Sequence, residues 1–371
     1  MKLEALELRR LDVPLVRPFR TSFGVQTSRD VLLVRAVSDE ADGWGECVAL
    51  SAPIYSSEYV EGAQAVIRDH LAPRLFKAGD VTARAVGPVL APVLGHRMAK
   101  ATLEMAVLDA ELCAHGMPLA QYLGGVRERV ECGVSVGIAP TIDELLEEVG
   151  GYIDHGYRRI KLKIQPGWDV EPVRAVRESF GEDLLLQVDA NAAYDAGTTS
   201  LLERLDDFNL LLIEQPFEEE DLQQHASLAE RLRTPICLDE SITSARAAAE
   251  AIRMGACRIV NIKAGRVGGY LEAARISDIC AALGVSVWCG GMLETGLGRA
   301  ANVALASLPN FRLPGDTSAS DRYYAEDITE PFVLVDGMLP VPTAPGVGVE
   351  LRVDVVEAMT TQMETLVPGL T

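Results

Sequence analysis

Along the first 50 residues, hydrophobic and polar positions alternate with the two-residue period of β-strands. Three such runs fit an antiparallel sheet: Leu3–Leu8, Val31–Val37 and Gly43–Val48. Further on, from Ser57 to Phe76 and from Arg97 to His115, apolar residues recur at the spacing of helices. Because the strands come first and the helices follow, we predict a small α+β domain over residues 1–125.

Between the first two predicted strands, a segment at about residues 18–26 carries apolar residues that fit no period. Phe19 and Phe23 stand on this segment, close to Gly24. Apolar side chains on a glycine-containing loop suit a lid that closes over a bound molecule. The alternative, in which both rings fill the domain core, explains the same residues equally well. Leu50 is a further apolar residue suited to a pocket under such a lid.

After Gly124 and Gly125, short apolar strands alternate with amphipathic helices, and a strand starts about every 25 residues, the length of one βα unit. The predicted strands are Val130–Ile138, Ile160–Ile164, Leu184–Val188, Leu210–Ile213, Ile236–Leu238, Ile259–Ile262 and Val285–Trp288. Parallel strands joined by crossover helices form a barrel or a doubly wound sheet, and seven or eight units favour the barrel. A solenoid would show a repeated sequence signature, and none recurs.

Beyond residue 318 the βα rhythm stops, and turn-forming residues dominate from Pro340 to Gly348. We therefore assign the α/β barrel to residues 126–318 and expect residues 319–371 to pack back on the N-terminal domain. In that arrangement the N-terminal domain covers one end of the barrel. A binding site is then expected between the two domains.

The composition narrows the classes of partner. Charged residues make up 24% and hydrophobic residues 48% of the 371, as in globular enzymes. The formal net charge of −20 argues against nucleic-acid binding, which needs clustered Lys and Arg. The sequence has no apolar span long enough for a bilayer and no apolar run after Met1, so we expect a cytoplasmic protein without membrane contact. The seven scattered cysteines are expected to be reduced and to act as small hydrophobic residues.

Three predicted strands end in acidic residues at equal spacing. Asp189, Glu214 and Asp239 are 25 residues apart, or one βα unit. Equal spacing places the carboxylates on neighbouring strands at the carboxyl end of the barrel, where barrel active sites lie. A single acid at a strand end is usually a helix cap, but three in register repel one another unless a cation lies between them. Oxygen ligands alone favour a hard divalent ion, Mg²⁺, with Mn²⁺ as a substitute.

Lysines flank the three acids on both sides. Lys161 and Lys163 share one face of the strand before Asp189, and Lys263 follows Asp239 by 24 residues. Alone, a Lys-x-Lys strand is typical of a solvated sheet edge. In a closed barrel, however, Lys163 and Lys263 would face each other across the metal ion. A lysine becomes a general base when a neighbouring cation disfavours its charged form, and Lys161 and the metal ion are such neighbours of Lys163.

This arrangement suits removal of the proton next to a carboxylate. The resulting enediolate carries two negative charges on oxygen, which a metal ion stabilises. The five histidines lie on predicted helices or loops, and the sequence has no serine-hydrolase or phosphate-loop motif. A glycine-rich turn at Gly290–Gly296, which includes Gly291 and Met292, suits either a tight βα turn or the wall of a substrate pocket.

With these residues in place, nearly the whole chain resembles the enolase superfamily, and within it the muconate lactonizing subgroup. Four longer strings are similar to the N-succinylamino acid racemase / o-succinylbenzoate synthase family: Pro18–Gly24, Ser56–Tyr59, Gly290–Gly296 and Leu313–Ser318. The resemblance implies a capping domain on a modified TIM barrel, (β/α)7β, with Mg²⁺ on the three acids and Lys163 and Lys263 as the acid/base pair. It also implies that Lys161, Ser135 and Asn191 lie near the substrate or directly behind it, and that the protein is a homo-oligomer.

The resemblance further implies a small-molecule carboxylate as substrate and two reactions at one site. Racemisation of an N-succinyl or other N-acyl amino acid needs both Lys163 and Lys263, whereas dehydration to o-succinylbenzoate, a step of menaquinone synthesis, needs one base. Dipeptide epimerase and muconate cycloisomerase are the alternatives, and epimerases of this kind carry Asp-x-Asp where this chain has Asp316-Thr-Ser. A metal-binding scaffold without turnover is disfavoured because both lysines and all three acids are present.

Overall fold

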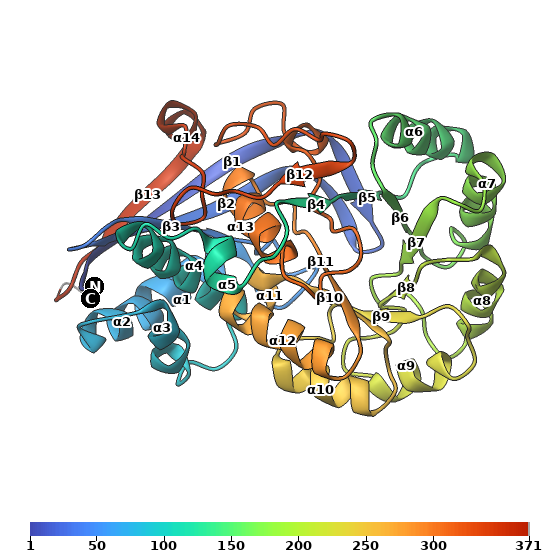
Figure 1. The fold of residues 1–371 in the computed structure, drawn as a ribbon, viewed down its shortest axis with the longest axis horizontal. Helices are drawn as coiled ribbons and strands as arrows, with labels where there is room; N and C mark the ends of the chain where they lie inside the picture. Colours follow the sequence, from blue (N-terminus) through green and yellow to red (C-terminus); the bar gives the residue numbers. More distant parts are fainter. Residues whose placement is uncertain (370–371) are drawn as a thin grey trace.

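The computed structural model describes residues 1–369, so residues 370 and 371 of the predicted C-terminal segment lie outside it. Figure 1 shows an antiparallel sheet with its helices on one side and a ring of parallel strands on the other. The helices that follow the parallel strands lie on the outside of the ring (Figure 1). One large group of buried apolar side chains joins the ring of parallel strands to part of the antiparallel sheet, and a second lies mainly between that sheet and its helices.

The antiparallel sheet has the strand order β13-β1-β2-β3. Its strands are β1 (Leu3–Thr21), β2 (Gly24–Ser38), β3 (Gly43–Cys47) and β13 (Thr360–Leu366). The helices are α1 (Val60–Val66), the π-helical turn η1 (Ile67–Leu71), α2 (Ala72–Ala78), α3 (Ala83–Leu90), α4 (Arg97–Ala114) and α5 (Leu119–Leu123). β3 approaches α4 so closely that a Cβ at Gly45 would lie 2.1 Å from the Thr102 carbonyl oxygen, so only glycine fits there.

The segment at about residues 18–26 does not have the loop structure that we predict for a lid. It forms the end of the β1–β2 hairpin, where Phe19 pairs with Gln26 and Thr21 pairs with Gly24. The Thr21 hydroxyl also donates a hydrogen bond to the Gly24 carbonyl at 3.3 Å. The strands continue because backbone pairing across the hairpin needs no apolar alternation at its tip, which is the signal that the sequence lacks.

Seven parallel strands form the ring in the order β11-β10-β9-β8-β7-β6-β5. They are β5 (Gly133–Val136), β6 (Arg159–Lys163), β7 (Leu185–Asp189), β8 (Ile213–Glu214), β9 (Ile236–Leu238), β10 (Ile259–Ile262) and β11 (Ser286–Cys289). The helices between and after them are α6 (Ile142–Asp154), α7 (Val170–Phe180), α8 (Thr199–Arg204) with η2 (Leu205–Phe208), α9 (Leu222–Ala229), α10 (Ala245–Arg253), α11 (Ala264–Val267), α12 (Tyr270–Ala282) and α13 (Gly296–Ala306).

An extended segment after α13 closes the ring between β11 and β5. Phe311 forms a parallel bridge with Val287 of β11, and Gly315 forms one with Cys132, which precedes β5. The Gly133 amide also donates to the Gly315 carbonyl at 2.7 Å. This segment acts as the eighth strand and no helix of the ring follows it within the described residues, which gives the (β/α)7β arrangement.

The end of the chain returns to the antiparallel sheet. After the short helix η3 (Ser320–Arg322), β12 (Met338–Pro340) pairs with β4 (Arg129–Glu131), and α14 (Val353–Met359) leads into β13. β13 pairs antiparallel with β1, from Leu6 with Leu366 to Leu11 with Thr360. The fold class predicted from the sequence, a (β/α)7β barrel with an α+β capping domain completed by the C-terminal segment, is confirmed.

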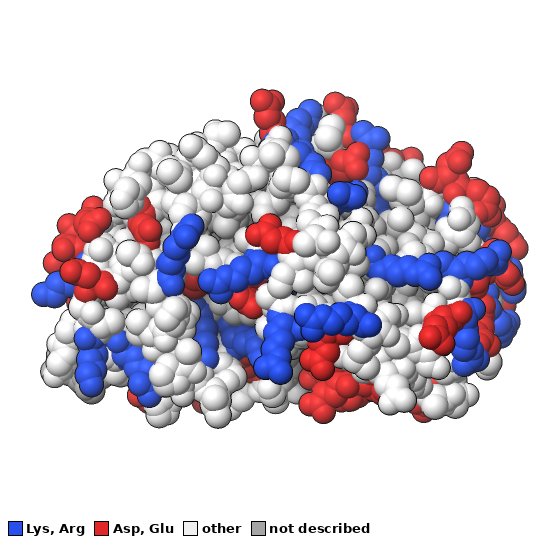
Figure 2. Space-filling model, turned by 60° about the horizontal axis from the view of Figure 1, so that its bottom comes forward, with Lys and Arg blue, Asp and Glu red and all other residues white. Residues whose placement is uncertain are grey.

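The surface in Figure 2 carries Lys and Arg side chains interspersed with Asp and Glu, separated by uncharged residues. This mixture differs from the continuous basic stripe that binds a nucleic-acid backbone. Within residues 1–369, every helix is too short or too polar to span a bilayer.

Candidate active site

The predicted acids and lysines meet at the carboxyl end of the ring. Lys163 ends β6, Asp189 ends β7 and Glu214 ends β8, and these three residues are paired in register across the strands. Asp239 directly follows β9, and Lys263 directly follows β10. All five side chains are buried, and the three acids are 0% exposed. Equal spacing in the sequence therefore becomes a single row of charged groups, because each βα unit returns the chain to the same end of the barrel.

Lys163 stands at one flank of the carboxylates. Its Nζ donates hydrogen bonds to Asp189 Oδ2 and to Asn191 Oδ1, both at 2.6 Å. The Asn191 amide in turn donates to Glu240 Oε1 at 2.9 Å, which fixes the amide oxygen toward the lysine. Asn191 has a left-handed backbone with φ of 42°, a conformation that asparagine tolerates better than most residues.

Lys263 stands at the opposite flank. Its Nζ lies 2.7 Å from Asp239 Oδ2 and 3.0 Å from the Tyr55 hydroxyl, and 4.8 Å from the centre of the Tyr55 ring. Burial lowers the pKa of Lys263, but the adjacent Asp239, Tyr55 and Glu240 outweigh burial and raise it well above its usual value. Arg266 shares Asp239, with its guanidinium 3.0 Å from Oδ1. These neighbours favour the charged form of Lys263.

Lys161 lies one step deeper in the barrel than Lys163. Its Nζ is 2.7 Å from Asp316 Oδ2, 3.1 Å from Glu214 Oε2 and 3.3 Å from Asp189 Oδ2. Burial opposes the charge, but Asp316 and the other carboxylates outweigh it and raise the pKa of Lys161. The sequence-based picture of Lys161 as an uncompensated cation beside Lys163 is therefore incomplete, because three acids surround it.

Below this row, Trp288 of β11 fills the barrel interior at 0% exposure. Its ring lies 4.7 Å from Lys161 Nζ and 5.0 Å from the Arg159 guanidinium. Arg159 also donates to Asp316 Oδ1 at 2.8 Å. One indole ring and one carboxylate thus hold two cations together, which restricts the orientation of Lys161.

The acids offer the ligand set that a hard divalent ion prefers. They supply oxygen donors only, and all three are shielded from water. Burial and the neighbouring Asp189 raise the pKa of Glu214 to about 8, the response expected when carboxylates are crowded. The buried Glu240 Oε2 accepts no hydrogen bond among residues 1–369, and Asp239 Oδ1 contacts the Arg266 guanidinium at 3.0 Å. These features fit a divalent cation.

The three acids do not lie close enough together to form a complete metal-binding site. In the described part of the chain, no three Asp, Glu, His or Cys side chains are close enough together to hold a metal ion as they stand. Each acid is paired instead: Asp189 with Lys163, Asp239 with Lys263, and Glu214 with Lys161 and with Asn261, whose amide donates to Glu214 Oε1 at 2.6 Å. The ammonium groups balance the carboxylate charge that a cation would balance.

The remaining predicted site residues divide into two groups. Phe23 lies next to the row of acids and lysines through Tyr55. Its ring centre is 5.7 Å from the Tyr55 ring centre, and the Tyr55 hydroxyl contacts Lys263. Leu50 and Met292 share the core of the capping domain, and Gly291 sits beside them on the loop after β11. A Cβ at Gly291 would lie 3.0 Å from the Asp316 carbonyl oxygen, so this loop lies beside the segment that carries Asp316.

Ser135 and Phe19 form the second group. Ser135 pairs in register with Lys161, and its buried hydroxyl has no hydrogen-bond partner among residues 1–369. Phe19 is 8% exposed and packs edge-on against Tyr323 at 6.1 Å. Arg322 joins the two, because it donates to the Ser135 carbonyl at 2.7 Å and lies 5.6 Å from the Phe19 ring. For Phe19 the structure favours the core alternative over a free lid.

Sequence reasoning missed several side chains that touch this row. Asp316 lay inside a string used for the family resemblance, so a signal was present. Tyr55 comes from a loop of the capping domain, and Asn261, Arg266 and Trp288 from barrel segments; none of these four carried a spacing or motif that marked it. Their contacts arise from packing between distant segments.

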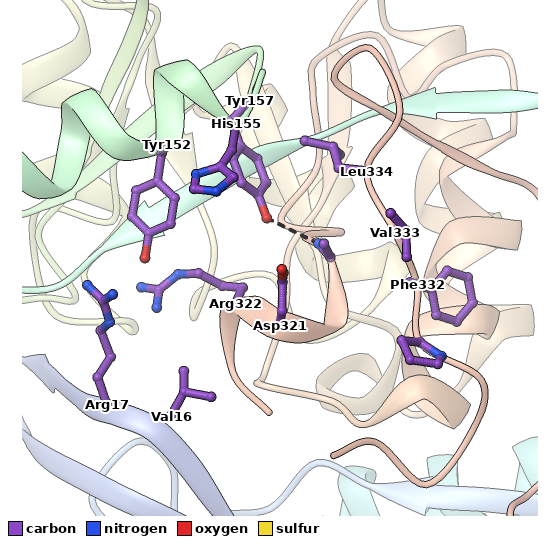
Figure 3. A pocket seen from close by; sticks show the side chains of 12 residues that line it. Val16, Arg17, Tyr152, His155, Tyr157, Asp321, Arg322, Phe332, Val333 and Leu334 are labelled. Carbon is purple, nitrogen blue, oxygen red and sulfur yellow. Dashed lines mark hydrogen bonds between the residues drawn. The ribbon is translucent and has the colours of Figure 1, made fainter. Parts of the chain in front are cut away.

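Two cavities lie beside this row and are not lined by its lysines or acids. One, of about 410 Å³, lies between α6 and the C-terminal segment, and Figure 3 shows the guanidinium groups of Arg17 and Arg322 near the Tyr152 hydroxyl. A neighbouring cavity of about 460 Å³ shares these three residues and extends to Phe19. The chemistry of the charged row, rather than cavity size, identifies the active site.

The barrel fold and the row of lysines and carboxylates define an enzyme that removes a proton from a carbon atom. Two family models match the chain: the model described as Mandelate racemase / muconate lactonizing enzyme, N-terminal domain, over residues 5–124, and Enolase C-terminal domain-like over residues 144–355. The chain belongs to the enolase superfamily, in its N-succinylamino acid racemase / o-succinylbenzoate synthase family. Members of this superfamily generally use a divalent metal ion.

The similar proteins agree along almost their whole length. An N-succinylamino acid racemase of Amycolatopsis sp is 66% identical over 97% of this chain and 98% of its own length. An o-succinylbenzoate synthase of Geobacillus kaustophilus is 48% identical, covering 95% of this chain and 94% of its own. A crystal structure of an enolase superfamily member from Listeria innocua has a TM-score of 0.95 at 40% identity, covering 99% of both chains. Muconate cycloisomerase 1 of Rhodococcus opacus, at 28% identity, is more distant.

Proposed function

We propose that the protein removes the proton α to the carboxylate of an N-acyl amino acid, such as an N-succinyl amino acid, and returns a proton to the opposite face. The observation that carries this proposal is the placement of two buried lysines on opposite flanks of one row of acids, Lys163 beside Asp189 and Lys263 beside Asp239. A racemase needs one proton-transfer group on each face of the α carbon. The names of the similar proteins support the N-succinyl group.

In this proposal Lys163 and Lys263 exchange roles with the direction of the reaction. The lysine on the side of the departing proton acts as base, and the lysine on the other side donates. Asn191 orients the Lys163 amine from the side away from Asp189, at 2.6 Å. Tyr55 orients Lys263 in the same way, at 3.0 Å. Such contacts reduce the rotamer freedom of a long side chain before the substrate arrives.

Lys161 has a different role, because carboxylates surround it and keep it charged. We assign it to electrostatic stabilisation of the developing enediolate rather than to proton transfer. Ser135, beside it on β5, offers a hydroxyl with no other partner among residues 1–369, which suits a contact to a substrate oxygen.

We further infer that Asp189, Glu214 and Asp239 hold Mg²⁺, with Mn²⁺ as a substitute. All-oxygen ligands of this kind match the preference of a hard cation. A cation bound there supplies electrostatic stabilisation for negative charge on the substrate carboxylate.

Dehydration to o-succinylbenzoate is a second proposed reaction at the same site. A syn elimination needs one base and a cation beside the developing charge, and Lys163 and Lys263 supply these. Asp316 argues against the dipeptide epimerase alternative. Its carboxylate already binds Lys161 and Arg159, at 2.7 and 2.8 Å. Muconate cycloisomerase stays an alternative that an assay with cis,cis-muconate tests directly.

Four wider statements remain part of the proposal. A cytoplasmic location is supported by seven free cysteines, six of them buried, which suit a reducing compartment. A homo-oligomer and a role in menaquinone synthesis are supported by the family resemblance. We also keep the boundaries 1–125, 126–318 and 319–371 as a proposal for the domain division.

The deciding experiment incubates the protein with each enantiomer of an N-succinyl amino acid in deuterated water with Mg²⁺. We expect deuterium at the α carbon and formation of the other enantiomer. If neither enantiomer gains α-deuterium, the racemase proposal is wrong. Parallel incubation with the cyclohexadiene carboxylate precursor separates the dehydratase reaction from racemisation.

A further inference from the structure

Two buried glutamates of the capping domain reach across to the first turns of two barrel helices. Glu46 of β3 accepts hydrogen bonds from the Thr295 amide at 2.9 Å, the Thr295 hydroxyl at 2.6 Å and the Gly298 amide at 2.9 Å, at the start of α13. Glu104 of α4 accepts from the Leu271 amide at 3.1 Å, at the start of α12. Glu46 is 4% and Glu104 5% exposed.

These carboxylates take the place of the missing local helix caps. Neither α12 nor α13 has a side-chain hydrogen bond from its own N-cap residue, Gly269 or Thr295. The first amides of a helix need acceptors, and the positive end of the helix dipole favours a carboxylate. The capping domain therefore supplies acceptors to both barrel helices, and Asp327 of the C-terminal segment supplies one more to α13 by accepting from the Gly296 amide at 2.7 Å.

Glycines make room for both contacts. A Cβ at Gly298 would lie 2.8 Å from Glu46 Oε2, and a Cβ at Gly269 would lie 2.2 Å from Glu104 Oε1. The fit is tight at both helices, so any side chain at these positions would push the carboxylate away.

α13 directly follows a loop that carries predicted site residues, whereas α11 stands between Lys263 and α12. Gly290–Thr295 joins β11 to α13 and carries Gly291 and Met292. Within this loop the Met292 amide donates to Glu294 Oε2 at 2.8 Å, and Leu293 has a left-handed φ of 55°. A strained backbone of this kind persists only when its surroundings fix it. The Glu46 contacts fix the end of the loop from the capping domain.

We propose that Glu46 is a positioning residue that holds the Gly290–Thr295 loop, and with it one wall of the substrate pocket, from the capping domain. Glu104 accepts one hydrogen bond from α12, which α11 separates from Lys263, and serves as the control for loss of a contact between the capping domain and a barrel helix. The consequence for kinetics rests on the proposed function, whereas the consequence for the loop itself does not.

The first test measures amide hydrogen exchange in Glu46→Gln, Gly298→Ala and Glu104→Gln. At pH 8, above the pKa of about 7 to which burial raises Glu46, the wild-type carboxylate accepts all three hydrogen bonds. A Gln side chain keeps the shape but offers a single acceptor oxygen. We expect exchange of the amides from Met292 to Gly298 to be about tenfold faster in the Glu46 and Gly298 variants and unchanged in Glu104→Gln.

Gly298→Ala makes this test independent of the loss of a charge. Alanine favours a helix over glycine, so the substitution by itself would strengthen α13. A Cβ at this position would also lie 2.9 Å from Glu294 Cβ and Cγ, so faster exchange in this variant supports the proposal only together with faster exchange in Glu46→Gln. Wild-type exchange in both the Glu46 and Gly298 variants, or an equal increase in Glu104→Gln, would overturn the proposal.

The second test compares kinetic constants for an N-succinyl amino acid. A pocket wall that is loosened weakens substrate binding more than proton transfer, so we expect KM to rise about tenfold in Glu46→Gln while kcat stays within about threefold. Glu104→Gln should keep the wild-type KM. Inactive wild-type protein together with altered loop exchange would refute the proposed function and leave the positioning role of Glu46 intact.

Discussion

The ammonium of Lys161 lies 2.7 Å from the carboxylate of Asp316, which joins β6 to the segment that closes the barrel. Asp316 also binds Arg159 at 2.8 Å and is almost fully buried. Burial opposes ionisation of Asp316, but Lys161 and Arg159 outweigh it and lower the pKa of this carboxyl. This ion pair joins β6 to the closing segment at the carboxyl end of the barrel, in addition to the backbone contacts that close the ring.

Asp316→Asn is expected to destabilise the protein by about 3–5 kcal/mol, because it leaves two buried cations short of a partner. It should also lower the rate of α-proton exchange, since Lys161 loses its fixed orientation. Urea unfolding gives the stability and deuterium incorporation gives the rate. Asp321→Asn, at an exposed position close by in the sequence, is the control and should change neither. Wild-type stability of Asp316→Asn would show that the pair has no anchoring role.

Lys163→Ala should abolish α-proton exchange from one enantiomer of the substrate preferentially, and Lys263→Ala should do the same for the other enantiomer. The two amines lie on opposite flanks of the acids, so each faces one side of the substrate. Loss of a general acid or base typically costs about 10²- to 10⁴-fold in rate. Nuclear magnetic resonance of each enantiomer in deuterated water measures this, with the exposed Lys77→Ala as control. An equal loss for both enantiomers in both variants would contradict the assignment of one lysine to each face.

Tyr55→Phe should slow proton transfer on the Lys263 side alone. The substitution removes the hydroxyl that accepts from Lys263 at 3.0 Å and keeps the ring. A hydrogen bond to a charged group contributes about 1.5–3 kcal/mol, so a loss of at least about tenfold is expected. Tyr59→Phe, on the same loop and 36% exposed, serves as control. The idea fails if the rates for both enantiomers fall together or stay at the wild-type value.

Removal of divalent metal with a chelator should abolish α-proton exchange while the fold persists. Each of the three carboxylates accepts a hydrogen bond from a lysine, so unfolding is not expected. Mg²⁺ or Mn²⁺ should restore activity, as expected for oxygen ligands. Circular dichroism tests the fold, and the exchange assay tests recovery. Full activity in the chelator-treated protein would exclude an essential metal ion.

Asp206 of η2, far from the active site, should control how the free energy of unfolding of the protein changes in acid. Burial opposes its ionisation, but hydrogen bonds from Thr234 and Arg233 outweigh burial and lower its pKa to about 2. Because the pKa is lowered from 3.8, the stabilisation is present above pH 3.8 and disappears as the pH falls through about 2. Asp206→Asn should therefore lose about 1–3 kcal/mol near pH 7 and show a flatter decline in acid. Thermal melts from pH 7 to 2 test this, with the exposed Asp207→Asn as control, and parallel pH curves for the two variants would refute it.

The sequence alone determined the parts of this protein that repeat locally. Apolar strands at one-unit spacing predicted the barrel, and the acids at the ends of three of them, with Lys163 and Lys263, predicted a row of charged side chains at its carboxyl end. These inferences succeed because the side-chain period of a strand and the length of a βα unit are local properties, and the closed barrel then brings the carboxyl end of every strand to the same place.

Only the tertiary structure decided which distant side chains complete the site. Tyr55 reaches Lys263 from the capping domain, Asp316 reaches Lys161 from the closing segment, and Glu46 crosses to α13. It also turned the expected lid loop into the end of a hairpin, with Phe19 buried near the turn. Such contacts join segments with no common period, and they depend on how the two domains pack, which the order of hydrophobic and polar residues does not encode.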